Sequence, residues 1–547
     1  MSVHQLPAEL LLSIFEYASL DDQSTGQIPT SNYPGWTAVT RSDPSTSTNI
    51  SQVCRRWRHL SLSDPMLWNR VPRSHESVTN TYLSRCSSAL LDVMIDPYAH
   101  FWGPAKHGDA QKLEDYIPRA RSLFISCRSS MGHGPPSYHS SSDERQNVKT
   151  FLEDFQPLSA PHLTELSMDL QMWFNTRARD TIPIPPHMFN GEPLRLLRSV
   201  KFNAVYMRQP QTFIWPALCC IELTDSRIWT HPDNFVPFFS GVPLLEELTS
   251  RNDGQARSSA NWSNATPVQD LPPLRSVPMK HLKALTFHGP YRDMFLALAI
   301  LDLPSSALLS FTLSGIWFAD DQEEKVRIMH EAVQVHFAQA MQAGAYFDNI
   351  TFDGRTMSAT HPVQDSLSAH LPPSFTLSIP LLEYDDHDPG SQALELEALF
   401  AYTVFTRAST LTIHSVDRCG VRGAAHRLDS FYHEELEHML ALYVDVQALH
   451  VTGEDVCNCV ANVLIQNELV PPNLAVLRMH GALFFSGAAH ETNFVSTPLL
   501  LSSLLRLSER FKRLELERCE LGEADVQQLR EGLGEGRLSV MDCEIEG

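Results

Sequence analysis

The chain has 547 residues, of which 43% are hydrophobic and 19% charged, and its formal net charge is −22. This apolar content is enough for a large folded core, which excludes a chain that is disordered throughout. The negative charge argues against nucleic acid as a partner, because a surface that binds phosphates must be basic to displace their counterions. No basic tract lies beside an apolar helix, so a membrane surface is not an expected partner either.

The N-terminus and the cysteines predict a cytoplasmic or nuclear protein. The first residues lack a basic segment and begin an amphipathic pattern, so no secretory signal peptide is predicted. The most apolar internal run, at 294–303, is shorter than the ~20 residues that cross a bilayer. Ten cysteines are spread along the chain without a C-x-x-C pair, which is typical of reduced thiols rather than of a disulfide framework.

The N-terminal seventy residues carry two helical patterns with a loop-like segment between them. In the first pattern, apolar residues within 10–18 recur at helical spacing after Pro7, which suits the first turn of a helix. Residues 19–49 break the pattern with twelve Ser or Thr residues and three prolines, so we expect a flexible insertion. The helical spacing resumes after Ser51, a good N-cap. One face of this second helix carries Val53, Trp57 and Leu60.

Both segments resemble an F-box, the short helical motif of substrate receptors in cullin-RING ubiquitin ligases. The matched stretches are LPAELLLSIFEYAS at 6–19 and ISQVCRRWRHLSLSDPMLWNRV at 50–71. The insertion between them is longer than the usual short link, but loop-closure entropy grows only logarithmically with length, so such an insertion is tolerated. The resemblance implies a docking module whose partner is the Skp-type adaptor that bridges F-box proteins to the cullin.

Apolar residues of this module are the candidate contacts to the adaptor. The alternative is that they only form the core of the module, but a unit of ~45 ordered residues is too small to bury both stripes internally. Each such side chain contributes ~1.5–3 kcal/mol when fully buried, and Trp and Phe are the expected hot spots. The predicted contacts are Leu6, Pro7, Leu10, Leu11, Ile14, Phe15, Val53, Trp57, Leu60, Leu67 and Trp68.

Beyond residue 73 a short pattern, apolar-x-x-apolar-x-apolar, recurs fifteen times in clear or weaker form, about every 32 residues. The alternation inside each copy is that of a β-strand. Clear copies lie at 162–168, 197–202, 218–223, 281–287, 308–313, 446–451, 473–479 and 511–516. Helical patterns lie between many copies, at 323–341, 394–406, 432–443, 456–464, 499–511 and 524–533.

A strand that alternates with a helix at a regular interval is typical of a leucine-rich-repeat solenoid. The interval exceeds the usual ~20–29 residues and the asparagine position is mostly unfilled, so the predicted solenoid is degenerate; an ordinary α/β sheet domain is the alternative. The predicted fold is therefore α/β: a small all-α F-box at 1–73, followed at 74–547 by a degenerate leucine-rich-repeat solenoid. The combination resembles F-box proteins of mushroom-forming fungi with leucine-rich-repeat-like C-terminal regions.

Several segments lack periodicity and are predicted to be loops. Three of them, at 129–147, 251–278 and 355–373, are rich in Ser, Pro, Asn and Gly. A fourth, at 383–388, is an acidic run that we expect to be solvated.

The alternating residues of the strands are the candidate target-binding surface. If the apolar residues of each strand point into the solenoid, the residues between them line the concave face. This set is polar and mixed in sign, and comprises Glu165, Ser167, Lys201, Asn203, Glu222, Thr224, Thr286, His288, Arg478, His480, Glu515 and Glu517. Residues 430–547 carry 19 acidic and 8 basic side chains, so a target of the C-terminal repeats is expected to be basic.

The sequence carries no signature of an active site. It has neither a phosphate-binding G-x-x-x-x-G-K-[ST] loop, nor a dinucleotide-binding G-x-G-x-x-G turn, nor a G-x-S-x-G nucleophile elbow. The histidine pairs His330/His336 and His433/His438 miss the four-residue spacing that places two metal ligands on one helical face. We therefore expect no catalysis, no cofactor and no metal site.

Together these features predict the substrate-recognition subunit of an SCF-type cullin-RING ubiquitin ligase. Its partners would be the Skp-type adaptor, the cullin scaffold and an unidentified target protein. It would hold the target near the ubiquitin-charged enzyme, so its contribution is proximity rather than catalysis. One alternative is a non-degradative scaffold that uses the same repeats, and another is an enzyme of unrecognised type.

Overall fold

The structure is a computed structural model. Its contacts divide the chain into two compact units: unit 1 is Met1–Ser250 with Gln255–Asn261, and unit 2 is Arg251–Gly254 with Trp262–Gly547. The predicted division between residues 73 and 74 stays a prediction. The described residues are 5–21, 45–71, 76–86, 89–95, 114–126, 141–170, 181–229, 232–252, 275–289, 291–313, 322–353, 356–361, 371–378, 402–414, 436–437, 440–466, 471–485, 495–507, 510–534 and 536–546.

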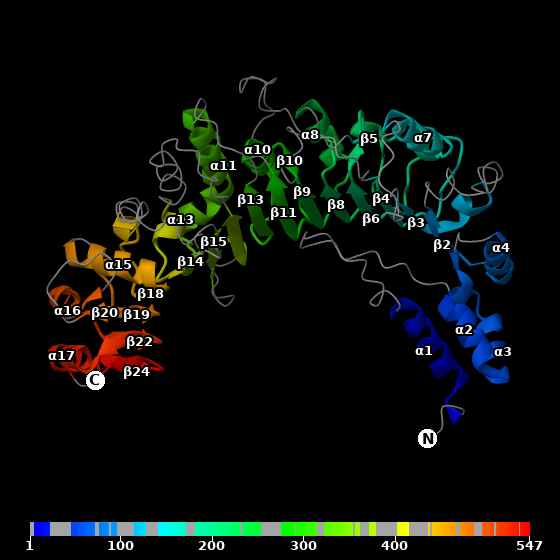
Figure 1. Ribbon diagram of the computed structural model, residues 1–547. Helices are drawn as coiled ribbons and strands as arrows, with labels where there is room; N and C mark the ends of the chain where they lie inside the picture. The colour runs from blue at the N-terminus through cyan, green and yellow to red at the C-terminus, as the bar shows by residue number, and fades with distance from the viewer. Residues whose placement is uncertain are drawn as a thin grey trace. The chain divides into compact units, whose positions relative to one another are not determined.

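Unit 1 begins with a helical module (Figure 1). The second helical pattern is divided at Cys54, an extended residue whose thiol accepts a hydrogen bond from the Trp57 backbone N–H at 3.4 Å. The helix is therefore capped at Cys54 rather than at Ser51. Residues 19–21 and 45–49 of the predicted insertion are helical, and 22–44 lie outside the described residues. The elements are α1 (Ala8–Asp21), α2 (Ser45–Val53), α3 (Arg55–Ser63), the 3₁₀ helix η2 (Pro65–Trp68) and α4 (Glu76–Arg85).

Aromatic side chains close the core of this module. Phe15 of α1 and Trp57 of α3 lie with their ring centroids 4.8 Å apart. The fully buried Trp68 donates from its indole N–H to the Ser61 carbonyl at 2.6 Å, and its ring packs at 4.9 Å against Tyr82 of α4. α4 thus supplies packing surface that the predicted three-helix unit lacked, so unit 1 buries part of both apolar stripes by itself.

A parallel sheet continues directly from the module. β1 (Arg70–Val71) pairs with β2 (Leu91–Ile95), and the Asn69 carbonyl accepts a hydrogen bond from the Asp92 N–H at 2.9 Å. The strands β2, β3, β4, β6 and β8 then pair in parallel, each with the next. Their bounds are β3 (Ala120–Ser126), β4 (Glu165–Asp169), β6 (Ser199–Asn203) and β8 (Cys220–Thr224), and β9 (Glu247–Arg251) begins beside Cys219.

The core of unit 1 lies on one side of this sheet. Alternate strand residues such as Val200 and Phe202 are at most 2% exposed, as the apolar alternation predicts. Trp215 packs between Phe202 of β6 and Phe238 of α8, with ring centroids 6.3 and 6.1 Å away. The remaining elements are η3 (Ile117–Arg119), α7 (Ser141–Glu153), β5 (Ile182–Pro183), η4 (Met188–Gly191), β7 (Val205–Tyr206), η5 (Pro210–Thr212) and α8 (Pro232–Ser240).

Unit 2 is built on a second run of mainly parallel strands. The pairs β11–β13, β17–β18, β18–β19, β19–β22 and β22–β24 are all parallel. Between β13 and β17 the chain inserts a meander: β14, β15 and β16 pair antiparallel, β16 pairs with β13, and β14 pairs with β17. The bounds are β11 (Ala284–Gly289), β13 (Leu308–Leu313), β14 (Asn349–Asp353), β15 (Thr356–Thr360), β16 (Ser374–Ser378), β17 (Thr410–His414), β18 (Ala448–Thr452), β19 (Val476–His480), β22 (Arg513–Glu517) and β24 (Leu538–Met541).

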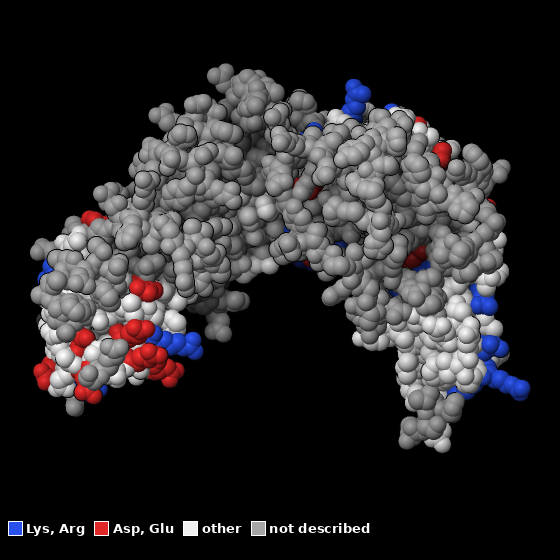
Figure 2. All heavy atoms as spheres, in the orientation of Figure 1, with Lys and Arg blue, Asp and Glu red and all other residues white. Residues whose placement is uncertain are grey.

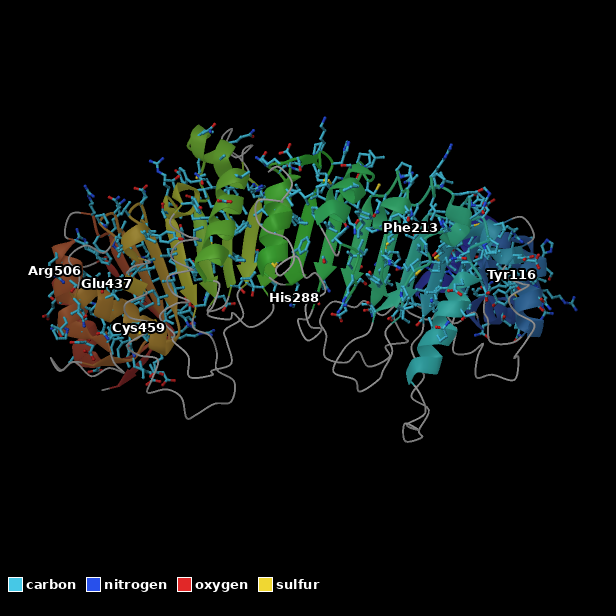
Figure 3. All side chains as sticks on the ribbon, turned by 90° about the horizontal axis from the view of Figure 1, so that it is seen from above. Tyr116, Phe213, His288, Glu437, Cys459 and Arg506 are labelled. Carbon is cyan, nitrogen blue, oxygen red and sulfur yellow. The ribbon has the colours of Figure 1, made fainter. Side chains whose placement is uncertain are left out.

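Helices connect the C-terminal strands of unit 2. Three predicted helices are confirmed, α11 (Gln322–Ala343), α15 (Glu454–Gln466) and α17 (Glu523–Leu533), whereas α16 (Thr497–Arg506) ends before the predicted residue 511. Arg506, labelled in Figure 3, donates to the Leu464 and Ile465 carbonyls at the end of α15. The other elements are β10 (Val277–Pro278), α10 (Tyr291–Ile300), β12 (Leu301–Asp302), α13 (Thr403–Thr406), β20 (Phe484–Phe485), β21 (Val495–Ser496), β23 (Glu520–Gly522) and β25 (Glu544–Glu546).

Three of the predicted loops contain regular structure. β15 lies inside the predicted loop 355–373. Buried and accessible residues alternate along it, as in a strand, but its sequence TMSAT is not strongly apolar and therefore did not predict one. α7 begins at Ser141, inside the predicted loop 129–147. β10 lies at the end of the predicted loop 251–278. The acidic run 383–388, the part 394–401 of the predicted helix 394–406, and half of the predicted helix 432–443 fall outside the described residues.

One turn geometry recurs after strands of both units. The first residue after each of six strands has a positive φ: Ala204, Asp225, Gly453, Gly481, Arg518 and Asp542. After β8, the Ser226 hydroxyl donates to the Phe202 carbonyl of the preceding strand at 3.1 Å. The thiols of Cys519 and Cys543 donate in the same way to Met479 and Leu516, at 3.4 and 3.6 Å. The position expected to hold asparagine is thus filled by serine or cysteine at these turns.

α11 buries a histidine in unit 2. His336 is 7% exposed, its ring lies 4.7 Å from that of Phe337, and its Nδ1 has no hydrogen-bond partner among the described residues. Burial, and secondly the nearby Arg275, lower the pKa of His336 to about 3.

We predict that unit 2 loses stability in acid because of this histidine. The unfolded chain takes up the proton below about pH 6.5 while the folded chain stays neutral, so stability falls as pH drops from there toward 3. The slope contributed is about 1.4 kcal/mol per pH unit. Denaturation of wild type and His336→Leu at neutral and mildly acidic pH measures it. Equal acid sensitivity of the two proteins would contradict the assignment.

A second prediction concerns the core of the module. Trp68→Ala removes a fully buried indole and should lower the free energy of unfolding by about 3–5 kcal/mol in chemical denaturation of the full chain. Leu62→Ala, on an α3 residue that is 40% exposed, is the control and should cost about 0.5 kcal/mol or less.

Candidate functional site

Several large apolar side chains are exposed on the helical module. Leu10, Ile14 and Tyr17 follow one another along α1 at helical spacing and are 52%, 48% and 68% exposed. Val53, at the end of the neighbouring α2, is 59% exposed. Figure 2 shows a mostly uncharged surface over α1 and α2 on the side that faces the viewer. We call Leu10, Ile14, Tyr17 and Val53 the α1–α2 face, an apolar surface open to a partner.

Internal hydrogen bonds fix the helices that carry this face. The Arg56 guanidinium donates to the Leu6 carbonyl at 2.5 Å, and Arg58 Nε donates to the Ser51 carbonyl at 2.9 Å. Both arginines belong to the basic stretch of α3, and they join the N-terminal segment and α2 to it. Part of the local positive charge therefore stabilises the module.

Residues 3–74 match the F-box-like family. The F-box-like domain contains α1, α2, α3, η2 and β1, and therefore the whole α1–α2 face. The match supports an F-box protein and, in general terms, a role as substrate adaptor of a ubiquitin ligase. No curated protein matches the chain.

The eleven predicted adaptor contacts of the F-box-like domain differ in exposure and fall into a buried, a half-buried and an exposed group. Leu11, Phe15, Leu67 and Trp68 are at most 3% exposed, so they form its core and are closed to a partner in this structure. Leu6, Trp57 and Leu60 are half-buried, and Pro7, Leu10, Ile14 and Val53 are exposed.

Sequence reasoning missed three exposed apolar residues of the F-box-like domain. Tyr17 continues the spacing of Leu10 and Ile14, so the helical pattern already contained that signal. Leu62 and Met66, on α3 and η2, are 40% and 44% exposed. Neither belongs to the predicted stripe, and their exposure follows only from the packing of η2 on the domain core.

The predicted target-binding residues lie on strands of both units, and most have accessible surface. In unit 1, Ser167, Lys201 and Glu222 form one row across β4, β6 and β8, with Lys201 Nζ 3.1 Å from a Glu222 carboxylate oxygen. The half-buried Met94 and Phe124 continue this row toward β2, and sequence reasoning missed both. The other accessible members are Glu165, Thr286, His288 (labelled in Figure 3), Arg478, His480 and Glu517.

Three predicted target-binding residues are buried, which corrects their expected place on an accessible face. Asn203 and Thr224 are 2% and 8% exposed, and the Asn203 side-chain amide donates to Asp169 Oδ1 at 2.8 Å. Both end their strands, directly before a residue with positive φ, so the alternation of faces stops there. Glu515 is 7% exposed, because two arginines cover its carboxylate.

Glu515 forms two ion pairs on the strand face of unit 2. Its carboxylate lies 2.5 Å from Arg478 Nη2 and 3.1 Å from Arg513 Nε. His450, the register partner of Arg478 on β18, belongs to the same row. Burial, and secondly Arg478, lower the pKa of His450, so the face gains no extra positive charge from it near neutral pH.

The described residues show no arrangement for metal or thiol chemistry. No group of three or more His, Cys, Asp or Glu side chains in this part of the chain is placed to hold a metal ion. Burial raises the pKa of the Cys86, Cys220 and Cys457 thiols, and that of Cys519 to about 11, which disfavours the nucleophilic thiolate. His433 and His438 lie outside the described residues. No described helix is both long and apolar enough to span a membrane.

The ion pairs of Glu515 give a prediction with a matched control on the same strand. Glu515→Gln removes a nearly buried carboxylate charge that forms ion pairs with two arginines. It should lower the free energy of unfolding by about 1.5–3 kcal/mol. Glu517→Gln, two residues away and half-buried, should cost about 0.5 kcal/mol or less. Equal losses in denaturant titrations would show that the pairs do not stabilise this face.

Proposed function

We propose that the protein is the substrate-recognition subunit of an SCF-type cullin-RING ubiquitin ligase. The observation that carries the proposal is the apolar α1–α2 face within residues that match the F-box-like family. An exposed apolar face is unfavourable in water and is stabilised when a partner covers it. The partner proposed for this face is the Skp-type adaptor, which connects the subunit to the cullin scaffold.

The exposure of each side chain shows which of the predicted residues are free to contact that adaptor directly. Leu10, Ile14 and Val53 are the proposed direct contacts, together with Tyr17. Each has about half or more of its side chain free to be buried, worth ~1–2 kcal/mol at the usual value for apolar area. Leu11, Phe15, Leu67 and Trp68 contribute by holding the helices in place.

We further propose that residues 74–547 form a degenerate leucine-rich-repeat solenoid. In-register parallel strands, a left-handed residue after the strand, and a Ser or Cys that donates to the preceding strand support this assignment. The meander of β14, β15 and β16 departs from the repeat.

The accessible strand residues are the proposed surface for the target protein. They include the row of Ser167, Lys201 and Glu222 in unit 1, and Arg478 with His480 in unit 2. Catalysis then belongs to other subunits of the ligase, and this chain contributes proximity in the cytoplasm or the nucleus.

A non-degradative scaffold is the second candidate. It uses the same repeats but joins no cullin, so the two functions differ in whether the cullin is recovered with the chain.

The α1–α2 face gives a direct test. Leu10→Asp/Ile14→Asp places two charges on exposed positions, which should leave folding intact and weaken capture of the Skp-type adaptor by at least about thirtyfold. Affinity capture with quantification of adaptor and cullin measures it.

The matched control is Leu196→Asp, on a 49% exposed apolar residue of unit 1 outside the F-box-like domain, and it should capture both partners like wild type. Adaptor recovery without cullin would favour the scaffold. Equal recovery by the double variant and the wild type, or recovery by neither, would contradict the proposed docking.

A further inference from the structure

Two arginines meet one buried carboxylate on the strand face of unit 2. Glu515 of β22 is 7% exposed and forms ion pairs with Arg478, its register partner on β19, and with Arg513 of its own strand. These side chains lie on the face opposite the core, because Leu514 and Leu516, which alternate with them along β22, are 0% exposed. In Figure 1, β19 and β22 lie side by side inside this sheet, between β18 and β24.

The two arginines carry donors that Glu515 does not use. The contacts to its carboxylate come from Nε and Nη2 of Arg478 and from Nε of Arg513, at 2.5–3.1 Å. A guanidinium group has five N–H donors, so most donors of the pair remain for a partner. The two arginine side chains are 41% and 49% exposed, and among the described residues no second carboxylate pairs with either. Because Glu515 is covered, the charge that the site presents is that of the guanidinium groups.

Most acidic side chains near the C-terminus lie on other elements. Of the 19 acidic residues of 430–547, only Glu515 and Glu517 belong to β18, β19, β22 or β24. The described others include residues of α17 and of the short strands β23 and β25. Glu517 is half-buried and lies about 7 Å farther along β22, in register with His480. The net charge of this region is therefore a poor guide to the charge of its strand face.

Two small apolar residues lie beside the arginines on the same face. Val476 of β19 is the register partner of Arg513, and Ala448 of β18 is the register partner of Val476. Both are half-buried rather than closed in the core. Val476 precedes Arg478 by two residues, which is the spacing between side chains on one face of any extended chain. An extended partner can therefore place an apolar and a charged side chain on both positions at once.

We infer that this face binds an extended segment of the target protein in which an apolar and an acidic residue stand two positions apart. The carboxylate of the segment accepts hydrogen bonds from Arg478 and Arg513, which Glu515 already holds in place, and the apolar side chain covers Val476 and Ala448. Charge complementarity selects the acidic residue, because a basic one would meet like charge at the guanidinium groups. The inference rests on the proposed function only in naming the bound protein as a target.

Peptides with one repeated pattern test the choice of charge on the full chain. In an extended valine–serine–glutamate–serine repeat, valine and glutamate alternate on one face and serine occupies the other. This peptide should bind at least about tenfold more tightly in fluorescence anisotropy than repeats with glutamine or lysine in place of glutamate, and its affinity should fall as salt is raised. The net charge of −22 opposes nonspecific binding of an acidic peptide, so such binding reports a local site.

Variants with the same change in charge locate the peptide on the chain. Arg513→Gln should weaken binding of the glutamate peptide at least about tenfold. Arg407→Gln is the matched control, because Arg407 ends α13, is 54% exposed and is also ion-paired, and it should leave the affinity unchanged. Should Arg513→Gln fail to fold, Arg513→Lys decides: it keeps the charge beside Glu515 but loses the planar fork, and should weaken binding about threefold or more.

The inference is overturned if the glutamine or lysine peptide binds as tightly as the glutamate peptide, if no peptide binds, or if Arg407→Gln weakens binding as much as Arg513→Gln does. A repeat with phosphoserine in place of glutamate should bind no more tightly, because it brings a second negative charge toward Glu517. Tighter binding of that repeat would overturn the choice of a carboxylate. Adaptor capture should be unchanged in these variants, because docking uses residues of unit 1, so the two proposals fail independently.

Discussion

The packing of Trp68 is the interaction on which unit 1 depends. Its buried indole touches α3 through the Ser61 carbonyl and α4 through Tyr82, and the Arg85 guanidinium lies 4.0 Å from the ring centroid. The next residues start β1 and pair with β2. One short segment thus completes the core of the F-box-like domain and begins the sheet, so the domain is an integral part of unit 1 rather than a separately tethered helix bundle.

The turns after the strands show how different residues satisfy one physical requirement. A chain that leaves a strand through a left-handed residue brings the following side chain beneath the preceding strand, where a carbonyl needs a donor. A hydroxyl meets this need at Ser226 and thiols meet it at Cys519 and Cys543. The Cys519 thiol is buried and burial raises its pKa, which keeps it protonated as a donor.

Sequence patterns predicted the F-box-like domain, most of the longer strands of both units and the helices α11, α15 and α17, because each depends on local periodicity. They did not predict which side of α1 is buried. Leu10 and Leu11 are adjacent and equally apolar, and their burial depends on packing within the folded domain. Cys54 was missed as a cap because Ser51 is the better N-cap by type. Asn203 and Thr224 were assigned to an accessible face because alternation was extended to the last residue of each strand, directly before the residue where the backbone turns.

The meander of β14, β15 and β16 bears on how such an array can grow. The middle strand runs against its neighbours, yet β14 and β16 both remain parallel to the strands outside the meander. Three inserted strands reverse direction twice, so the sheet regains its original polarity. An insertion of two strands in the same style would leave β17 and the strands after it antiparallel to β13 and the strands before it. An antiparallel insertion of this style therefore keeps one strand direction on both of its sides only when it contains an odd number of strands.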